Sequence, residues 1–81
     1  MLYVYILKSN KTNRYYIRHT ENIEKRLIIH NRGRVRSTKN GIPWKVIYTE
    51  KCTNRSIAYQ REMQIKKYKG GIQFKKLISS K

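Results

Sequence analysis

The chain contains few or none of several features that would mark other classes of protein. Its 81 residues include a single cysteine, Cys52, which rules out an intramolecular disulfide and favours a reducing, cytoplasmic setting. No apolar run approaches the roughly 20 residues that a membrane-spanning helix needs. The apolar N-terminal stretch is short and has no basic leader, so we expect no signal peptide. At this length we expect one small domain over residues 1–81.

Acidic residues are also scarce. Four Glu and no Asp stand against 20 Lys and Arg, which gives a formal net charge of +16. A domain with this excess repels copies of itself and attracts polyanions, so we expect a monomer or weak dimer whose partner is nucleic acid. An anionic membrane surface is the competing partner, but no strongly amphipathic basic helix dominates the chain. A highly charged surface that serves only solubility is the remaining alternative.

The missing residue types also exclude several active sites. Without Asp there is no Ser–His–Asp set, and the chain has no glycine-rich phosphate loop. With one cysteine, no His–Cys cluster is available to hold zinc.

The order of apolar runs, caps and glycines predicts an α+β fold. Capping residues near positions 20–22 and 53–54 predict the starts of two helices, and Gly33 and Gly70–Gly71 lie near their ends. The expected architecture is a small three-stranded antiparallel sheet flanked by helices, in the order β-β-α-β-α-α. In chain order the predicted elements are strands Tyr3–Leu7 and Arg14–Arg18, helix Asn22–Arg32, strand Trp44–Glu50, a helix ending near Tyr68, and a short last helix or turn with Phe74, Leu77 and Ile78.

The first two strands are expected to form a hairpin. We place Tyr5 opposite Tyr16, and the antiparallel order then pairs Leu7 with Arg14 and Tyr3 with Arg18. Because side chains alternate between the faces of a strand, one face collects phenols and a guanidinium, which is unlike a dry core. An ordinary sheet face whose hydroxyls reach solvent is the alternative. The other face is more apolar and is expected to seat the core: Val4, Ile6, Tyr15 and Ile17.

The first helix carries two polar residues beside its packing stripe. Ile23 and Leu27 form the stripe, and Arg26 and His30 flank it as neighbours one turn apart. An Arg in this place suggests a phosphate ligand, because its planar guanidinium matches phosphate geometry. The alternatives are a solvated Arg26 with a buried stem and a His30 that interacts with the helix dipole.

The second long helix carries one carboxylate on an apolar face. Glu62 shares that face with Ala58 and Ile65. A carboxylate there needs a cation or a metal ion. A plain salt bridge to a nearby Lys or Arg is the alternative.

Together these motifs resemble the GIY-YIG nuclease superfamily, and within it the small single-domain bacterial-type members. "YVYIL" at 3–7 and "YIR" at 16–18 stand where its two defining motifs stand, and "NIEKRL" at 22–27 resembles its first helix. The remaining matches follow in order and with fitting spacing: "HN" at 30–31, "ST" at 37–38, "PWKVIYTE" at 43–50 and "AYQREMQIKK" at 58–67. The resemblance therefore covers nearly the whole chain.

The resemblance implies an endonuclease-like domain that hydrolyses phosphodiester bonds in nucleic acid, with DNA as the expected substrate. Tyr5 would activate the attacking water, Tyr16 would position the water or the phosphate, and Arg26 would grip the phosphate. His30 would be a second base or a phosphate donor, and Glu62 would hold a single Mg²⁺ or Mn²⁺. The basic residues expected to bind the flanking nucleic-acid backbone are Arg18, Arg32, Arg34, Arg36 and Lys39.

The chain departs from the family pattern in both motifs. Tyr3 and Val4 replace the Gly and Ile of the first motif, and Arg18 replaces the glycine of the second. The Arg18 side chain would either obstruct a phosphate or add a ligand to it. The alternative function is therefore a catalytically weakened nucleic-acid-binding module that uses the same basic face. A basic structural protein of a ribonucleoprotein explains the charge but not the ordered tyrosines and Glu62.

Overall fold

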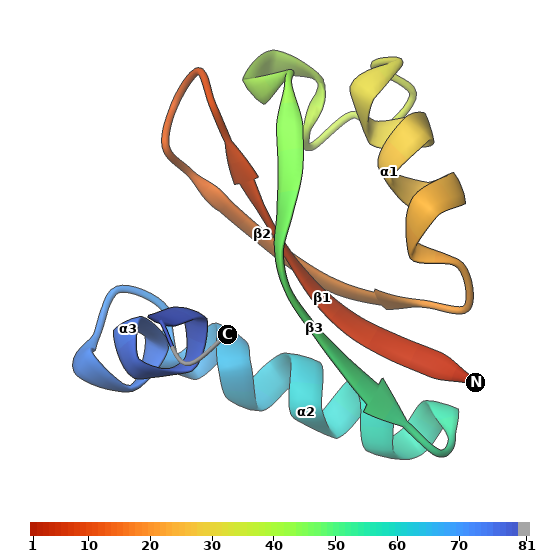
Figure 1. The fold of residues 1–81 in the computed structure, drawn as a ribbon, viewed down its shortest axis with the longest axis vertical. Coiled ribbons are helices and arrows are strands. Elements are labelled where there is room, and N and C mark those ends of the chain that lie inside the picture. The colour runs from red at the N-terminus through yellow and green to blue at the C-terminus, as the bar shows by residue number, and fades with distance from the viewer. Residues whose placement is uncertain (80–81) are drawn as a thin grey trace.

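The structure, a computed structural model, describes residues 1–79, so the last two residues of the expected domain lie outside the described part. Its elements follow the predicted β-β-α-β-α-α order, and Figure 1 shows the sheet between α1 on one side and α2 on the other. The elements are β1 (Leu2–Ser9), β2 (Tyr15–Thr20), α1 (Ile23–Asn31), the 3₁₀ turn η1 (Lys39–Gly41), β3 (Trp44–Cys52), α2 (Arg55–Tyr68) and α3 (Ile72–Ser79). Within residues 1–79, no helix is both long enough and apolar enough to cross a membrane.

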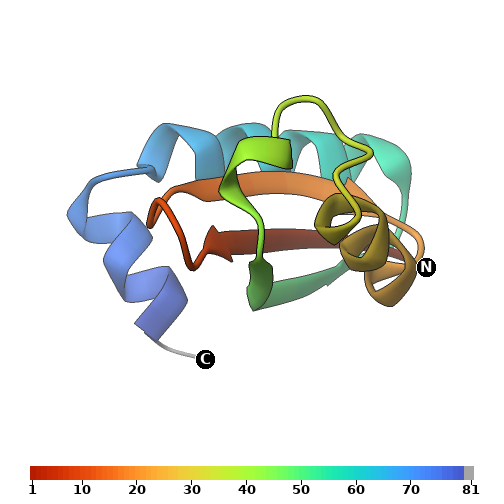
Figure 2. The same ribbon diagram turned by 90° about the horizontal axis from the view of Figure 1, so that it is seen from above.

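The three strands form one antiparallel sheet with β1 in the middle, as Figure 2 shows from above. The predicted hairpin is present, but its predicted pairing is wrong by two residues. Tyr5 pairs with Arg18 instead of Tyr16, and the other pairs shift with it: Leu7 with Tyr16 and Tyr3 with Thr20. A shift by two leaves each side chain on its predicted face, because the side-chain period of a strand is two.

A tight turn explains the shift. The Ser9 N–H donates to the Arg14 carbonyl at 2.9 Å, so β1 runs further toward the turn than predicted. The Ser9 hydroxyl accepts from the Thr12 N–H at 2.9 Å and the Lys11 N–H at 3.1 Å. Asn13 closes the turn with φ 61, a left-handed conformation that Asn tolerates. Turn geometry of this kind sets the register of a hairpin.

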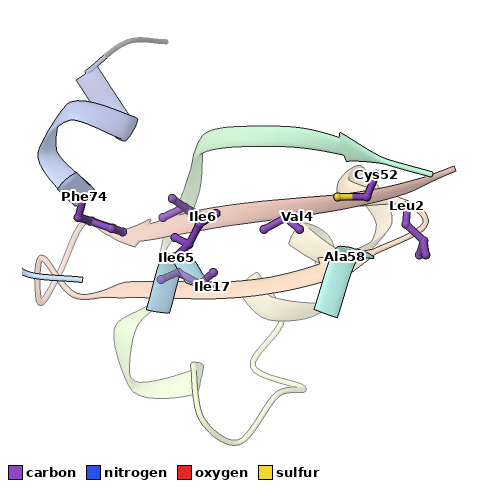
Figure 3. Packing of buried hydrophobic residues seen from close by; sticks show 8 residues of the cluster. All are labelled: Leu2, Val4, Ile6, Ile17, Cys52, Ala58, Ile65 and Phe74. Carbon is purple, nitrogen blue, oxygen red and sulfur yellow. The ribbon is translucent and has the colours of Figure 1, made fainter. Parts of the chain in front are cut away.

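One face of the sheet, here called the α2 face, holds an apolar core as predicted, with mostly aliphatic side chains. Figure 3 shows its buried side chains between the strands and the two C-terminal helices. Val4, Ile6, Ala58 and Ile65 have no exposed surface at all. The buried members are Leu2, Val4, Ile6, Ile17, Cys52, Ala58, Ile65 and Phe74.

The opposite face, here called the α1 face, is also covered. Tyr5, Leu7 and Trp44 form a second buried cluster, and Ile23 and Leu27 of α1 pack against it as their spacing predicts. The expectation that the phenol-rich face would not form a core is therefore wrong for Tyr5, which is 1% exposed.

A bulge in β3 lets this strand serve both faces. Ile6 pairs with Tyr48 while Leu7 pairs with Val46, so one extra residue is inserted opposite the Ile6–Leu7 step. Because the bulge reverses the alternation, Cys52 points to the α2 face whereas Trp44 and Val46 point to the α1 face. Trp44 thus reaches the cluster around Tyr5.

The helix starts are fixed by asparagine caps, which settles the two open choices of capping residue. The Asn22 side chain accepts from the Lys25 N–H at 3.0 Å, and the Asn54 side chain accepts from the Ile57 N–H at 2.9 Å. Gly33 ends α1 with φ +74, as its position suggested. The segment between α1 and β3, here called the basic loop for its Arg32, Arg34, Arg36 and Lys39, contains the short turn η1.

Candidate functional site

A cleft of about 730 Å³ opens at the end of β2, where the chain turns into α1. Tyr5 and Arg18, which pair across the hairpin, and Arg26 of α1 all line it, so the structure brings these three predicted residues together. The remaining lining residues come from the start of β1, the end of β2 and the turn after it, α1 and the start of α2: Leu2, His19, Thr20, Glu21, Asn22, Lys25, Ile29 and Arg55. The cleft is thus strongly cationic.

A buried chain of hydrogen bonds begins at Tyr5. Its hydroxyl lies 3.2 Å from Nε2 of His30, and His30 Nδ1 lies 2.8 Å from the Thr38 hydroxyl. The Thr38 hydroxyl donates to the Val35 carbonyl at 3.3 Å, so it must accept from Nδ1–H of His30. His30 Nε2 then carries no proton and accepts from Tyr5 O–H. Thr38 therefore fixes the tautomer in which His30 can receive the phenol proton.

Burial keeps the two titratable members of this chain, Tyr5 and His30, neutral. It raises the pKa of Tyr5 to about 12, and this effect outweighs the hydrogen bond and positive charge of Arg26, which lower it. Burial, together with the charges of Arg26 and Arg18, lowers the pKa of His30 to about 4. His30 is fully buried in the last turn of α1, where its two ring nitrogens contact Tyr5 and Thr38.

The C-terminal end of α1 is clamped to the start of β3. The side-chain amide of Asn31 donates to the Trp44 carbonyl at 3.0 Å, and its oxygen accepts from the Trp44 N–H at 2.7 Å. The Trp44 indole N–H donates to the Thr38 carbonyl at 2.7 Å. These bonds hold His30 and Thr38, one on each side of the loop after α1, at hydrogen-bonding distance.

Tyr16 does not line the cleft in the described part of the chain. Its ring packs edge-on against His30, with centroids 4.9 Å apart, and against Trp44 at 6.3 Å. In this structure the ring of Tyr16 therefore supports the imidazole that bonds Tyr5 and is not directed at the cleft.

Glu62 lies on the α2 face, beyond the edge of the cleft. It is 3% exposed, and its Oε1 accepts from Nδ1 of His19 at 2.7 Å while its Oε2 accepts from Lys66 Nζ at 2.8 Å. Nε of Arg18 lies 4.0 Å from Oε1. Burial would raise the pKa of Glu62, but the bonds from Lys66 and His19 outweigh it and hold the pKa below its usual value.

The carboxylate oxygens of Glu62 are ligands that suit a hard divalent cation. Its carboxylate is oriented by His19, as ligating carboxylates usually are by a neighbouring donor, and the Lys66 ammonium is a cation bound at the second oxygen. The Lys66 side chain is 39% exposed and can move away. Within residues 1–79, no three His, Cys, Asp or Glu side chains converge, so further ligands would have to be water and phosphate oxygens.

The basic loop residues lie apart from the cleft. Arg32, Arg34, Arg36 and Lys39 are all exposed, and none of them lines it. The structure also adds residues that sequence reasoning missed, since Lys25, Arg55 and His19 line the cleft and Thr38 ends the Tyr5 chain. His19 follows Arg18 directly, and Thr38 belongs to the "ST" pair at 37–38, so sequence adjacency was the available signal.

Comparison with known proteins shows the family of the chain. A sequence profile described as the GIY-YIG catalytic domain matches residues 1–75. A UPF0213 protein of Clostridium perfringens is 43% identical over 82 aligned positions, which cover 100% of this chain and 86% of that protein. A UPF0213 protein of Staphylococcus haemolyticus is 39% identical over 67 residues, or 82% of this chain and 80% of its own length. No solved structure gives a significant match to this chain.

Proposed function

The chain belongs to the GIY-YIG family, and on that basis we propose that it is an endonuclease that hydrolyses phosphodiester bonds in nucleic acid, with DNA as the substrate. One observation carries the proposal: the cleft gathers Tyr5, Arg18 and Arg26 at one end of the sheet, and the buried carboxylate of Glu62 contacts its edge through Arg18 and His19. This combination would supply cations that hold a phosphate, a hydroxyl that orients water, and a metal ligand.

The cations of the cleft would hold the scissile phosphate. Arg26 projects from α1 beside Tyr5, close enough to lower the pKa of its phenol, and its guanidinium can donate two parallel hydrogen bonds to phosphate oxygens. Lys25 and Arg55 line the same cleft and add positive charge around the bound backbone. The exposed basic loop, from Arg32 to Lys39, would bind flanking phosphates without reading sequence.

Tyr5 would orient the attacking water. Its proton points to His30, which leaves oxygen lone pairs of Tyr5 to accept a hydrogen bond from water in the cleft. With pKa values of about 12 and about 4, Tyr5 and His30 are both neutral at physiological pH. In the free enzyme Tyr5 would therefore accept a hydrogen bond from the water as a neutral phenol and not as a phenolate. Proton transfer along the chain would follow only as negative charge develops in the cleft.

Glu62 would hold the single Mg²⁺ or Mn²⁺, which when bound would stabilise the charge on the leaving oxygen. His19 keeps the carboxylate oriented through Oε1, and Lys66 would leave Oε2.

The test is incubation with single-stranded, nicked, flapped and branched DNA, and with matched RNA, in Mg²⁺, Mn²⁺ or chelator. We expect cleavage of at least one DNA substrate that needs the divalent ion. Glu62→Gln should reduce it by about a thousandfold, or about 4 kcal/mol, while folding and binding persist. Glu24→Gln, an exposed carboxylate on α1, is the matched control and should cleave normally. A Glu62→Gln variant that cleaves at the parent's rate would reduce Glu62 to a salt-bridge partner.

A second function is favoured by one observation. Arg18 stands where the family has glycine, and it lies in the cleft beside the carboxylate that would bind the metal. This supports the alternative of a catalytically weakened module that binds nucleic acid through the same basic face. Binding without cleavage on every substrate and with either metal would favour that alternative.

A further inference from the structure

Arg18 is the charged side chain that lies between the cleft and the carboxylate of Glu62. It belongs to the edge strand β2, pairs with Tyr5 across the hairpin and lines the cleft. Its Nε also lies 4.0 Å from Oε1 of Glu62, whose helix packs on the other face of the sheet. Arg18 is half exposed, whereas the Glu62 side chain is almost completely buried.

These positions give the Arg18 guanidinium two possible anionic partners. At Glu62 it helps to neutralise a carboxylate that is buried and would otherwise be costly. In the cleft it would face the backbone of a bound nucleic acid together with Arg26. One side chain cannot serve both fully, so occupancy of one partner changes its availability to the other.

We propose that Arg18 is an internal counter-ion of Glu62 which a divalent cation displaces, and that the displaced guanidinium then becomes a phosphate ligand in the cleft. The proposal rests on the metal site of the proposed function and adds a coupling to it. Cation binding at Glu62 and phosphate binding in the cleft both favour the Arg18 position away from Glu62, so each promotes the other.

Lys66 also pairs with Glu62 but differs from Arg18 in its position relative to the cleft. It bonds Glu62 more closely than Arg18 does, at 2.8 Å, but it does not line the cleft. A divalent cation would therefore displace both side chains, yet only the release of Arg18 would be felt by a bound phosphate.

The experiment measures Mn²⁺ affinity of the metal-free full chain by electron paramagnetic resonance at constant ionic strength. Arg18→Gln keeps much of the side-chain length and removes the charge, and we expect it to bind Mn²⁺ about two- to fivefold more tightly, the range of a partly exposed ion pair. Lys25→Gln removes one positive charge from the same cleft without a contact to Glu62, and its Mn²⁺ affinity should change less. Circular dichroism establishes that each variant is folded.

A second measurement follows the other partner. Affinity for a short DNA duplex is measured with chelator and with Ca²⁺, which seeks the same oxygen ligands. The affinity lost in Arg18→Gln should be greater with Ca²⁺ than with chelator, because Arg18 is then free of Glu62. Lys25→Gln and Lys66→Gln should lose no more with Ca²⁺ than with chelator, since their contribution is only screened further.

The outcomes distinguish failure of the Arg18 proposal from failure of the proposed endonuclease function. If Glu62→Gln abolishes Mn²⁺ binding but Arg18→Gln behaves like Lys25→Gln, the metal site stands and the counter-ion role of Arg18 is overturned. The role is also overturned if the loss of duplex affinity in Arg18→Gln is the same with and without Ca²⁺. If Glu62→Gln leaves Mn²⁺ affinity unchanged, the metal assignment of the proposed function fails and the competition fails with it.

Discussion

The two faces of the central sheet are built on different principles. The buried side chains of the α2 face are aliphatic except for Cys52 and Phe74, and Glu62, the one buried charge that the described residues place on this face, lies where it meets the edge strand β2. The α1 face buries aromatic rings together with an imidazole and hydroxyls, and there Ser9, His30 and Thr38 are all fully or almost fully buried. Each of these polar groups is satisfied, since no buried side-chain polar atom in the described residues is without a partner.

The α2 face mainly stabilises the fold, whereas the α1 face orients a residue of the candidate site. Packed aliphatic groups stabilise the fold at any pH, and their contribution depends on volume more than on direction. A buried polar network depends on every member and on protonation, because an unmatched group in a low-dielectric interior is costly. The α1 face can therefore hold Tyr5 in one orientation, but it tolerates substitution and changes of protonation less well than the α2 face. The two faces should respond differently to truncation, to pH and to the loss of a single hydroxyl.

The largest effect is expected from truncation on the α2 face. Ile65 is fully buried in the aliphatic core, and Ile65→Ala should lower the free energy of unfolding by about 3 kcal/mol through lost burial and a residual cavity. Ile57→Ala on the same helix, where Ile57 is 46% exposed, is the control and should cost less than about 0.5 kcal/mol. Urea unfolding measures both. Equal losses at the two positions would contradict the account of the α2 face as a packed core.

Acid should weaken the α1 face first. The pKa of His30 is about 4 in the folded chain, against 6.5 for an ordinary histidine, so the unfolded chain binds more protons between these values. Stability from His30 is fully present above pH 6.5 and is lost as the pH falls toward 4, by about 3 kcal/mol in all. Urea unfolding of the parent and of His30→Gln, measured from pH 7 downward, isolates this contribution.

Two carboxylates contribute in a lower pH range and serve as an internal reference. Arg61 and Tyr48 outweigh burial and lower the pKa of Glu50, and cation partners likewise lower that of Glu62, so their stability is lost mainly below 4.5, the ordinary pKa of a glutamate. Between pH 6.5 and 4.5 the parent should therefore lose stability more steeply than His30→Gln. Parallel curves in that interval would mean that His30 is not held neutral.

The smallest of the three effects is expected from removing one hydroxyl on the α1 face. Tyr5→Phe keeps the ring but leaves Nε2 of His30 without its donor, which should cost about 1–3 kcal/mol of stability. If Tyr5 orients the attacking water, cleavage should also fall, by about 100-fold. Tyr59→Phe, at an exposed tyrosine, is the control for both measurements. Unchanged stability in Tyr5→Phe would mean that solvent replaces the phenol at His30.

Much of the fold could be predicted from local patterns. Apolar runs and caps specified the element order, and the alternation of side chains placed Tyr5, Tyr16 and Arg18 on one face and Val4, Ile6 and Ile17 on the other, as the structure confirms. The same holds for the apolar face of α2, where Glu62 lies between Ala58 and Ile65. These features depend on the periods of helices and strands, which the sequence carries directly.

The pairing of Tyr5 was beyond these patterns, because a period of two fixes the face of a side chain and not its partner. The Ser9–Arg14 bond set that register, and the bulge in β3 sent Trp44 to the α1 face although a regular strand would have kept it with Cys52. Tyr16 shows the consequence, since its face was predicted correctly but its ring packs on His30 and not in the cleft.

By itself, the sequence determined the elements, their order, the faces of their side chains and a net charge that attracts polyanions. Only the tertiary structure decided that Tyr5 is buried and bonded to a neutral His30, and that Arg18 lies within reach of Glu62. The physical reason is distance along the chain. Tyr5 and His30 are 25 residues apart, and Arg18 meets a helix that forms much later, so the contacts depend on how α1 and α2 pack on opposite faces of one sheet. Local periodicity does not specify that packing, and the chemistry of the site depends on the packing.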